Sequence, residues 1–279
     1  MKSAKLKKLN FLFIAVLFIV SVLFPLFFAD QASNFWAIFV STILIFIFAL
    51  WHALIKFGFR NTLIFLGLVA IISFVSEYIG VNFGYSFGGG YYYTDYLKPA
   101  FFKIPVLVFL MWVAIIYIAY QIAEHITDYR FTKKISLAKR AAVSFFTAVF
   151  AALATVAWDL TLDPLATKSG WWVWQELEAS KGFLGVPFGN FIGWMLVSFA
   201  VVFIFKVFFE KESLEKESIF EFSPLVAYLL LWITNFVWAL SLGQIILAVV
   251  SIITMWPFIL LLVIRAVNRY YKLPKQYKS

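Results

Sequence analysis

The sequence predicts an all-α membrane protein: a polytopic bundle of about eight transmembrane helices with two long outer loops rich in aromatic residues and glycine. The first observation is composition: the 279 residues are 64% hydrophobic and 13% charged, with a mean hydropathy of +0.94. A soluble domain carries about 25% charged residues. The second is that apolar stretches near the length of about 20 residues needed to span a bilayer recur along the whole chain. We therefore expect residues 1–279 to form a single integral membrane domain.

The expected spans follow from hydropathy alone. They are Phe11–Ala29, Phe35–Ile55, Thr62–Ser76, Ile104–Ala123, Ala141–Leu160, Phe188–Phe209, Ser223–Leu242 and Ile245–Val267. The first is too long and too apolar for an ordinary signal peptide, and no small-residue cleavage site follows it closely. The third is short and can extend through Tyr78 and Ile79.

Charge asymmetry predicts the orientation of these spans. With the N-terminus in the cytoplasm, 19 of the 23 lysines and arginines lie on the cytoplasmic side. Because basic loops stay inside, we expect a multi-pass protein of the cell membrane with both termini in the cytoplasm. Anionic lipid head groups suffice as partners for the net charge of +9, so no nucleic acid is expected.

Several kinds of chemistry are disfavoured by what the sequence lacks. The chain has no cysteine, which excludes disulfides, thiolate metal sites and a cysteine nucleophile. Its two histidines, His52 and His125, are too few for a histidine-rich di-iron site. The run at 88–90 lacks the Lys-Ser/Thr that follows a phosphate-binding glycine loop. We expect no metal and no cofactor.

Two aspartates at the end of the fifth expected span are the strongest functional signal. Asp159 and Asp163 are one helical turn apart and would project from one face. Acids at membrane depth are costly and usually functional. Pro164 is expected to end the helix close to Asp163 and to leave that carboxylate wetter than Asp159. A purely structural role, capping loop backbone or pairing with a nearby lysine, remains open.

The two expected outer loops, 77–103 and 159–187, align with an offset of 82 residues. The offset places Glu77 on Asp159. It also matches Gly88 with Gly170, Tyr92 with Trp174, Pro105 with Pro187 and Trp112 with Trp194. We infer a weak parallel repeat, 62–123 and 141–209, which would bring Glu77 and Asp159 to the same membrane face around one pocket. Aromatic belts at membrane interfaces would give a similar composition without a repeat.

These residues also carry a resemblance to a known family. The motifs are Glu77-x-x-Gly80, Phe87-Gly88 with Tyr91 and Tyr93, Trp158-Asp159-Leu160-x-Leu162-Asp163-Pro164, Gly170-x-Trp172-x-Trp174, and Gly185-Val186-Pro187-x-x-Asn190-Phe191-x-Gly193-Trp194. Together they resemble the CruF-type carotenoid biosynthesis family, which includes carotenoid 1',2'-hydratases and bisanhydrobacterioruberin hydratases. The resemblance covers about residues 77–194. Lys98-Pro99 and Lys103-Ile104-Pro105 depart from the expected Gly-Pro and Gly-Val-Pro, which bears on substrate identity more than on fold.

The resemblance implies hydration of an acyclic carotenoid: water adds across the terminal isopropylidene double bond and gives a tertiary 1-hydroxy group. Burial and a neighbouring carboxylate both favour the protonated form of a carboxyl group. We therefore expect Asp159 to donate the proton and Asp163 to adjust the pKa of Asp159. Glu77 or Asn190 would orient and deprotonate water. The expected substrate-binding residues are Tyr85, Tyr91, Tyr92, Tyr93, Trp158, Trp172, Trp174, Asn82, Asn190 and Trp194, whose aromatic members would stabilise a cation.

Two other functions fit parts of the pattern. A membrane prenyl-lipid transferase would use the acids to hold magnesium diphosphate. A proton-coupled transporter would use one carboxylate for coupling, and the internal repeat is compatible with that. For the hydratase, the expected partners are the carotenoid, the lipid bilayer and other carotenoid-pathway enzymes.

Overall fold

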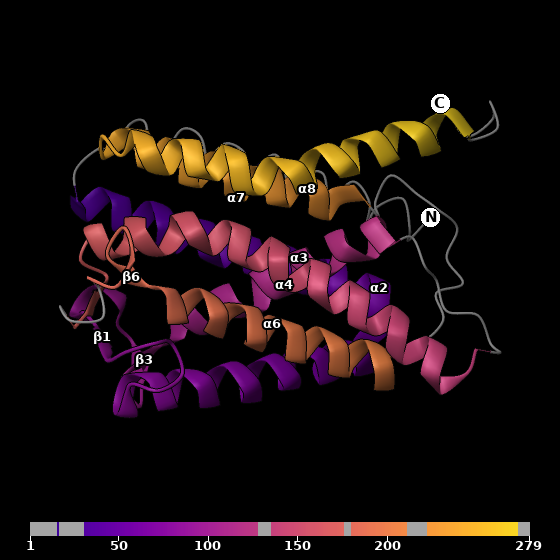
Figure 1. Cartoon of the computed structure of the whole chain (residues 1–279), viewed down its shortest axis with the longest axis horizontal. Coiled ribbons are helices and arrows are strands. Elements are labelled where there is room, and N and C mark those ends of the chain that lie inside the picture. Colours follow the sequence, from indigo (N-terminus) through magenta and orange to yellow (C-terminus); the bar gives the residue numbers. More distant parts are fainter. Residues whose placement is uncertain (1–15, 17–30, 128–134, 176–179, 211–221, 273–279) are drawn as a thin grey trace.

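The computed structural model describes residue 16 and residues 31–127, 135–175, 180–210 and 222–272. Long helices lie side by side, and short strands gather at one end of the bundle (Figure 1). The helices are α2 (Gln31–Phe83), α3 (Val106–Thr127), α4 (Leu137–Lys168), α6 (Phe188–Phe208), α7 (Ser223–Ser241) and α8 (Ile245–Lys272), with a 3₁₀ turn at Asp95–Leu97. The first expected span, Phe11–Ala29, falls almost entirely outside the described residues.

Helix α2 consists of two arms joined at Gly58. This glycine has φ 75° and ψ 168°, a conformation outside the helical region that glycine adopts without a side-chain clash. The break lies between the second and third expected spans, and the chain returns along the bundle after it (Figure 1). The second arm continues to Phe83, beyond the expected end at Ser76.

Six helices among the described residues are long and apolar enough to cross a membrane. The folded helix α2 supplies one of them, Phe39–Phe83, whose 45 residues would extend about 68 Å if straight. That length is more than twice the hydrocarbon core of about 30 Å. The prediction of a helical membrane bundle is therefore confirmed, while the number eight is not.

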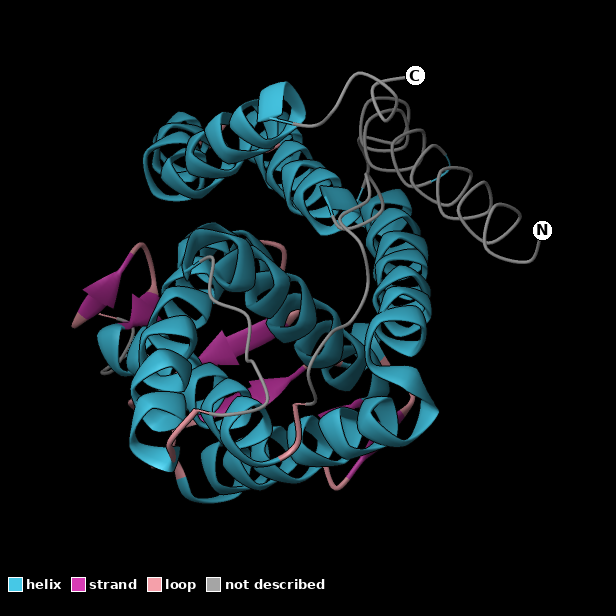
Figure 2. Ribbon diagram, turned by 90° about the vertical axis from the view of Figure 1, so that its right-hand side faces the viewer, coloured by secondary structure: helices cyan, strands magenta, loops and turns pink. Residues whose placement is uncertain are grey.

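Helices α3 and α4 form the centre of the bundle. Helix α3 is almost wholly buried, with Trp112, Ile116 and Tyr120 inaccessible to solvent. Helix α4 packs against α3, α6, α7 and α8. Viewed along the bundle, helices form a ring, and strands are seen both within it and at its edge (Figure 2).

Three pairs of short antiparallel strands close one end of the bundle. Strand β1 (Tyr91–Tyr93) pairs with β4 (Trp172–Trp174), β2 (Ala100–Phe101) with β3 (Ile104–Pro105), and β5 (Gly182–Phe183) with β6 (Val186–Pro187). The β5–β6 pair follows the β2–β3 pair by 82 positions in the sequence. Helix α3 begins directly after β3, and helix α6 begins directly after β6. The first pair joins the two aromatic loops, so residues 79 to 83 positions apart in sequence become neighbours.

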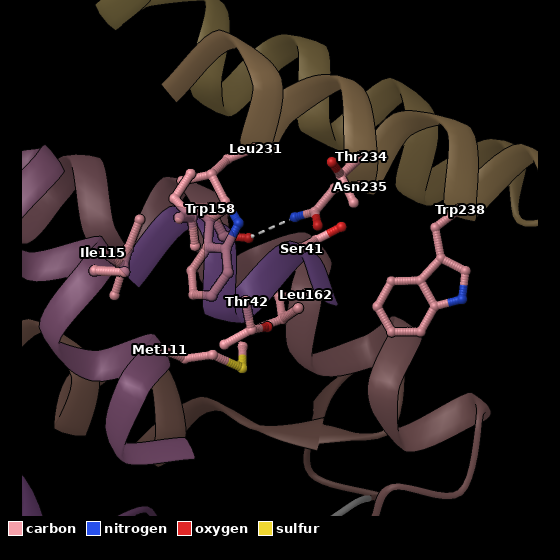
Figure 3. Close-up of a pocket in the computed structure, with 12 residues that line it drawn as sticks. Ser41, Thr42, Met111, Ile115, Trp158, Leu162, Leu231, Thr234, Asn235 and Trp238 are labelled. Atoms are coloured by element: carbon pink, nitrogen blue, oxygen red, sulfur yellow. Dashed lines mark hydrogen bonds between the residues drawn. The ribbon is translucent and has the colours of Figure 1, made fainter. Parts of the chain in front are cut away.

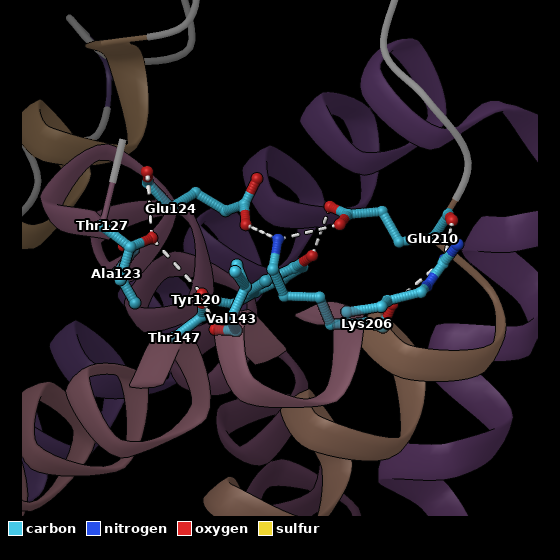
Figure 4. Close-up of polar contacts among 9 residues, drawn as sticks. Tyr120, Ala123, Glu124, Thr127, Val143, Thr147, Lys206 and Glu210 are labelled. Atoms are coloured by element: carbon cyan, nitrogen blue, oxygen red, sulfur yellow. Dashed lines mark hydrogen bonds and ion pairs between the residues drawn. The ribbon is translucent and has the colours of Figure 1, made fainter. Parts of the chain in front are cut away.

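A buried ionic cluster lies at the other end of α6. The Lys206 ammonium group, inaccessible to solvent, contacts the carboxylates of Glu124 and Glu210, the latter at 2.8 Å (Figure 4). Tyr120 donates to Glu210 Oε1 at 2.5 Å, and Arg140 donates to the backbone carbonyls of Lys206 and Glu210. A buried charge requires such pairing, so this cluster ties together α3, α4 and α6.

Candidate active site

Carboxyl groups from two different helices meet in a small cavity under the strands. We call it the acid chamber. It is lined by Glu77, Phe87, Tyr91, Tyr93, Val108, Met111, Leu162, Asp163, Trp172, Trp174, Asn190 and Trp194. Its volume of about 20 Å³ is close to what one water molecule needs, and its polar lining offers that water hydrogen-bond partners.

Asp159 and Asp163 are buried side by side on α4, with exposed fractions of 0% and 3%. The side-chain amide of Asn190, in the first turn of α6, donates to Oδ2 of both, at 3.1 Å for Asp159. A single amide donor therefore holds the two carboxyl groups together.

The expectation that Asp163 sits at a wet helix end is wrong. Helix α4 continues through Pro164 to Lys168, so Asp163 lies inside the helix. A proline removes one backbone donor, and packed helices in a membrane tolerate that loss. Asp163 faces the acid chamber, whereas Asp159 lies behind it and its Oδ1 has no donor among the described residues.

Glu77 is held by three donors. The hydroxyls of Tyr91 and Tyr93 donate to Oε2 at 2.6 and 2.8 Å, and the indole Nε1 of Trp112 donates to Oε1 at 2.9 Å. These three donors, with no acceptor among the described residues, favour an ionised carboxylate, whereas burial of the group opposes ionisation. Glu77 is 4% exposed and reaches the acid chamber from α2.

The two tyrosines are fixed as donors by their surroundings. Burial first, and the charge of Glu77 second, raise the pKa of both phenols well above the usual tyrosine value. Both hydroxyls therefore keep their protons at neutral pH. Their hydrogen bonds to Glu77 always run in the same direction.

Strand pairing explains which aromatic rings enter the chamber. In the β1–β4 ladder Tyr91 pairs with Trp174 and Tyr93 with Trp172. Alternate residues of a strand point to opposite faces. These four rings therefore share the inner face, while Tyr92 points outward and is 58% exposed.

A tryptophan stack connects the two halves of the site. The rings of Trp112 on α3 and Trp194 on α6 lie 3.6 Å apart between centroids with an interplanar angle of 19°. Trp158 approaches Trp194 edge-on at 6.0 Å. Trp112, which donates to Glu77, is thus packed against Trp194, which lines the chamber together with Asp163.

The structure brings together most, but not all, of the residues that the sequence singled out. Glu77, Asp163, Tyr91, Tyr93, Trp172, Trp174, Asn190 and Trp194 line the acid chamber, with Asp159 directly behind. Tyr85 is 82% exposed and, like Tyr92 and Asn82, lines none of the cavities described here. The Asn82 amide bonds the carbonyl of Tyr78 in its own helix instead.

Sequence reasoning assigned no role to several residues of the site. Trp112 had been noted only as the match of Trp194 in the internal repeat, and Phe87 only as part of a motif. Met111 and Leu162 also line the chamber. Leu162 stood in the quoted motif without a role, and Met111 is an ordinary apolar helix residue that nothing in the local sequence marks. For Trp112, the offset of 82 was the usable signal.

Two further cavities flank the acid chamber. The first, which we call the α7 cavity, has a volume of about 50 Å³, lies between α2, α3, α4 and α7, and shares Met111 and Leu162 with the chamber (Figure 3). Trp158 lines it, and Asn235 donates to the Trp158 carbonyl at 3.3 Å and to Thr161 Oγ1 at 2.8 Å. The second, the hairpin cavity beside β2–β3, shares Glu77 and Val108 with the chamber.

Comparisons with known proteins give the family. Bisanhydrobacterioruberin hydratase from Haloarcula japonica is 31% identical over 178 residues, which cover 60% of this chain and 54% of that protein. The match therefore spans about half of that relative's length. No solved structure matches the chain. The family described as "Carotenoid biosynthesis protein" matches residues 33–257, most of the sequence and the whole site. The chain belongs to the carotenoid biosynthesis protein family.

Proposed function

We propose that this protein is a carotenoid end-group hydratase, which adds water across the terminal isopropylidene double bond of an acyclic carotenoid. A proton adds to C-2 and leaves a tertiary cation at C-1. Water adds to that cation and loses a proton, so the product is a tertiary alcohol and no redox change occurs. The observation that carries the proposal is the acid chamber, a water-sized cavity with Glu77 and Asp163 in its wall.

The aspartate pair supplies the proton. The sequence favoured Asp159 as the donor, but Asp163 is the member that lines the chamber. In the proposed arrangement Asp163 delivers the proton, and Asp159 with Asn190 holds it in place from behind. General acids of this kind contribute about 10²–10⁴-fold to a rate.

Glu77 acts on the water. Its three donors support the ionised form, and an ionised carboxylate accepts hydrogen bonds. A water molecule in the chamber can therefore donate to Glu77 while its lone pair points to the cation. Glu77 then takes the proton that the added water releases.

Aromatic faces stabilise the cation. Trp172, Trp174 and Trp194 line the chamber together with the two tyrosines. A cation over an aromatic face gains about 0.5–2 kcal/mol. Several aromatic faces around one chamber can add to this stabilisation, because the chamber has room for only about one water molecule that could solvate the cation instead.

A direct test uses cells that make lycopene. Expression of the chain should yield a product heavier by one water, and growth with H₂¹⁸O should place the heavy oxygen in it. Asp163→Asn should lower product formation by about 10²-fold or more at equal protein amount, and Asp159→Asn should lose less. Full activity in Asp163→Asn, or oxygen derived from O₂, would refute the reaction as written.

The proposed setting is the cell membrane, with both termini in the cytoplasm, the site near the outer face, and other carotenoid-pathway enzymes as partners. The chain has no cysteine, so single cysteines report sidedness cleanly. Cysteines at the exposed positions Lys139 and Lys168, at opposite ends of α4, should react with an impermeant reagent from opposite sides. Reaction of both from one side would contradict this topology.

A further inference from the structure

The largest of the three cavities shares Glu77 and Val108 with the acid chamber. The hairpin cavity has a volume of about 260 Å³. Its wall combines the second arm of α2, the β2–β3 hairpin and the start of α3. Besides Glu77, it is lined by Ser73, Phe74, Phe101, Ile104, Pro105, Val106, Val108, Phe109 and Trp112.

This lining suits a hydrocarbon. Ser73 donates its hydroxyl to the Val69 carbonyl at 2.7 Å, so its donor is already used. Glu77 is held by its own three donors and is the charged group of the wall. An apolar cavity of about 150 Å³ is large enough to bind benzene, which has six carbons. The hairpin cavity is larger and can take a five-carbon isoprene unit with part of the next.

The rim of the cavity faces an apolar surface. Phe74 is 37% exposed and Phe101 67% exposed, although both line the cavity. Ile71, Val75 and Phe102 beside them are exposed as well. In a membrane protein such a surface lies against lipid. A long hydrophobic molecule can therefore insert one end and keep the rest of its length in the bilayer.

The α7 cavity is smaller and has more polar groups in a mostly apolar wall. Its volume is about 50 Å³, and hydroxyl or amide groups of Ser41, Thr42, Thr234 and Asn235 stand in its wall. Such a space fits one or a few water molecules better than a branched hydrocarbon end. Size is thus the main difference between the two neighbours of the acid chamber.

We propose that the hairpin cavity is the binding site for the acyclic isoprenoid end group. The inference rests on the hydratase proposal for its chemistry, and it adds where the substrate binds. Glu77 and Val108 belong to both the hairpin cavity and the acid chamber. The terminal double bond would lie between these two side chains, with its polyene extending past Phe74 and Phe101 into lipid.

Photoaffinity labelling tests the site without relying on turnover. The probe is a C20 acyclic isoprenoid that carries a diazirine beside its terminal isopropylidene group. Peptide mapping should find adducts at residues 71–77 and 101–109, and unlabelled lycopene should suppress them. Adducts centred on residues 41–45 or 231–238, or no lycopene-sensitive adduct at all, would overturn the assignment.

Two half-buried, β-branched residues provide matched variants. Val106→Trp fills the hairpin cavity and should reduce labelling at least tenfold, whereas Thr234→Trp fills the α7 cavity and should leave labelling unchanged. Phe109→Trp provides a second blockade if Val106→Trp fails to accumulate. The reverse pattern, with labelling lost only in Thr234→Trp, would assign the end group to the α7 cavity.

The two proposals fail in distinguishable ways. Specific labelling of the hairpin cavity without any hydrated product would refute the hydratase reaction and keep the binding site. Hydrated product with labelling elsewhere would keep the reaction and refute the site.

Discussion

The hydrogen bond from Trp112 to Glu77 provides the sharpest test of how the site handles charge. Trp112→Phe keeps an aromatic ring in the stack with Trp194 but removes the indole donor 2.9 Å from Glu77 Oε1. The two tyrosine bonds to Oε2 remain. The variant therefore removes one of three donors to the carboxylate that we propose as the base.

The expected size of the effect follows from that bond. A hydrogen bond to a charged group contributes about 1.5–3 kcal/mol. If the bond is needed in the transition state, its loss lowers turnover about 10- to 150-fold, because about 1.4 kcal/mol corresponds to a factor of ten. Removing both tyrosine hydroxyls should cost more than removing the indole donor alone.

The assay is hydrated product formed from lycopene per unit of protein in membranes. Trp194→Phe is the matched control, because it disturbs the same stack, worth about 0.5–1.5 kcal/mol, and keeps the Trp112–Glu77 bond. Phenylalanine keeps an aromatic face toward the chamber at position 194, so the difference between the two variants reports mainly the loss of the indole donor. If Trp112→Phe accumulates normally and is no slower than Trp194→Phe, then the charge of Glu77 is not part of the reaction.

Two further predictions concern stability. The pKa of Tyr91 and Tyr93 is higher in the folded state than the unfolded value of about 10. Their contribution to stability is therefore present below about pH 10 and is lost as the pH rises above it. Between pH 9 and 11 in detergent, the unfolding temperature should fall less steeply for the double phenylalanine variant than for the unsubstituted protein, and an identical slope would contradict this. Alanine at Gly88 (φ 78°) would place its Cβ 2.6 Å from the Cα of Gly189, whereas at Gly170 (φ 71°) it meets nothing within 4 Å. Gly170→Ala should therefore cost only the left-handed backbone penalty of roughly 1–2 kcal/mol, and Gly88→Ala should abolish accumulation in the membrane; equal stability of the two would refute the close approach.

Much of this architecture follows from hydropathy, because a membrane span is recognisable as an apolar stretch of about 20 residues. The break in α2 at Gly58 coincides with a short basic segment, which the charge pattern had already separated from the spans. The end of α4 could not be predicted in the same way. Pro164 is a helix-breaking signal locally, and only the packing around it decides that the helix continues to Lys168.

The acids of the site were predictable, but their environment was not. Glu77, Asp159 and Asp163 stand out because carboxyl groups are rare at membrane depth. Which aromatic rings face them depends on the β1–β4 register, which selects Tyr91 and Tyr93 and turns Tyr92 outward. The register joins residues 79 to 83 positions apart, and no local pattern in either loop specifies it.

The buried Lys206 has a consequence for how the chain is built. A lysine inside a membrane helix raises the cost of inserting that helix by about 2.5–3.5 kcal/mol when it is central and less near an end. Its partner Glu124 lies on α3, which is synthesised before α6, while Glu210 lies four residues after Lys206. Glu124 is thus already present when the lysine enters the bilayer, and α6 adds it to the local counter-charge of Glu210 by docking on α3. The ionic cluster in this way couples insertion of α6 to the earlier helices. It also favours the docking position of α6 in which Asn190 contacts Asp159 and Asp163.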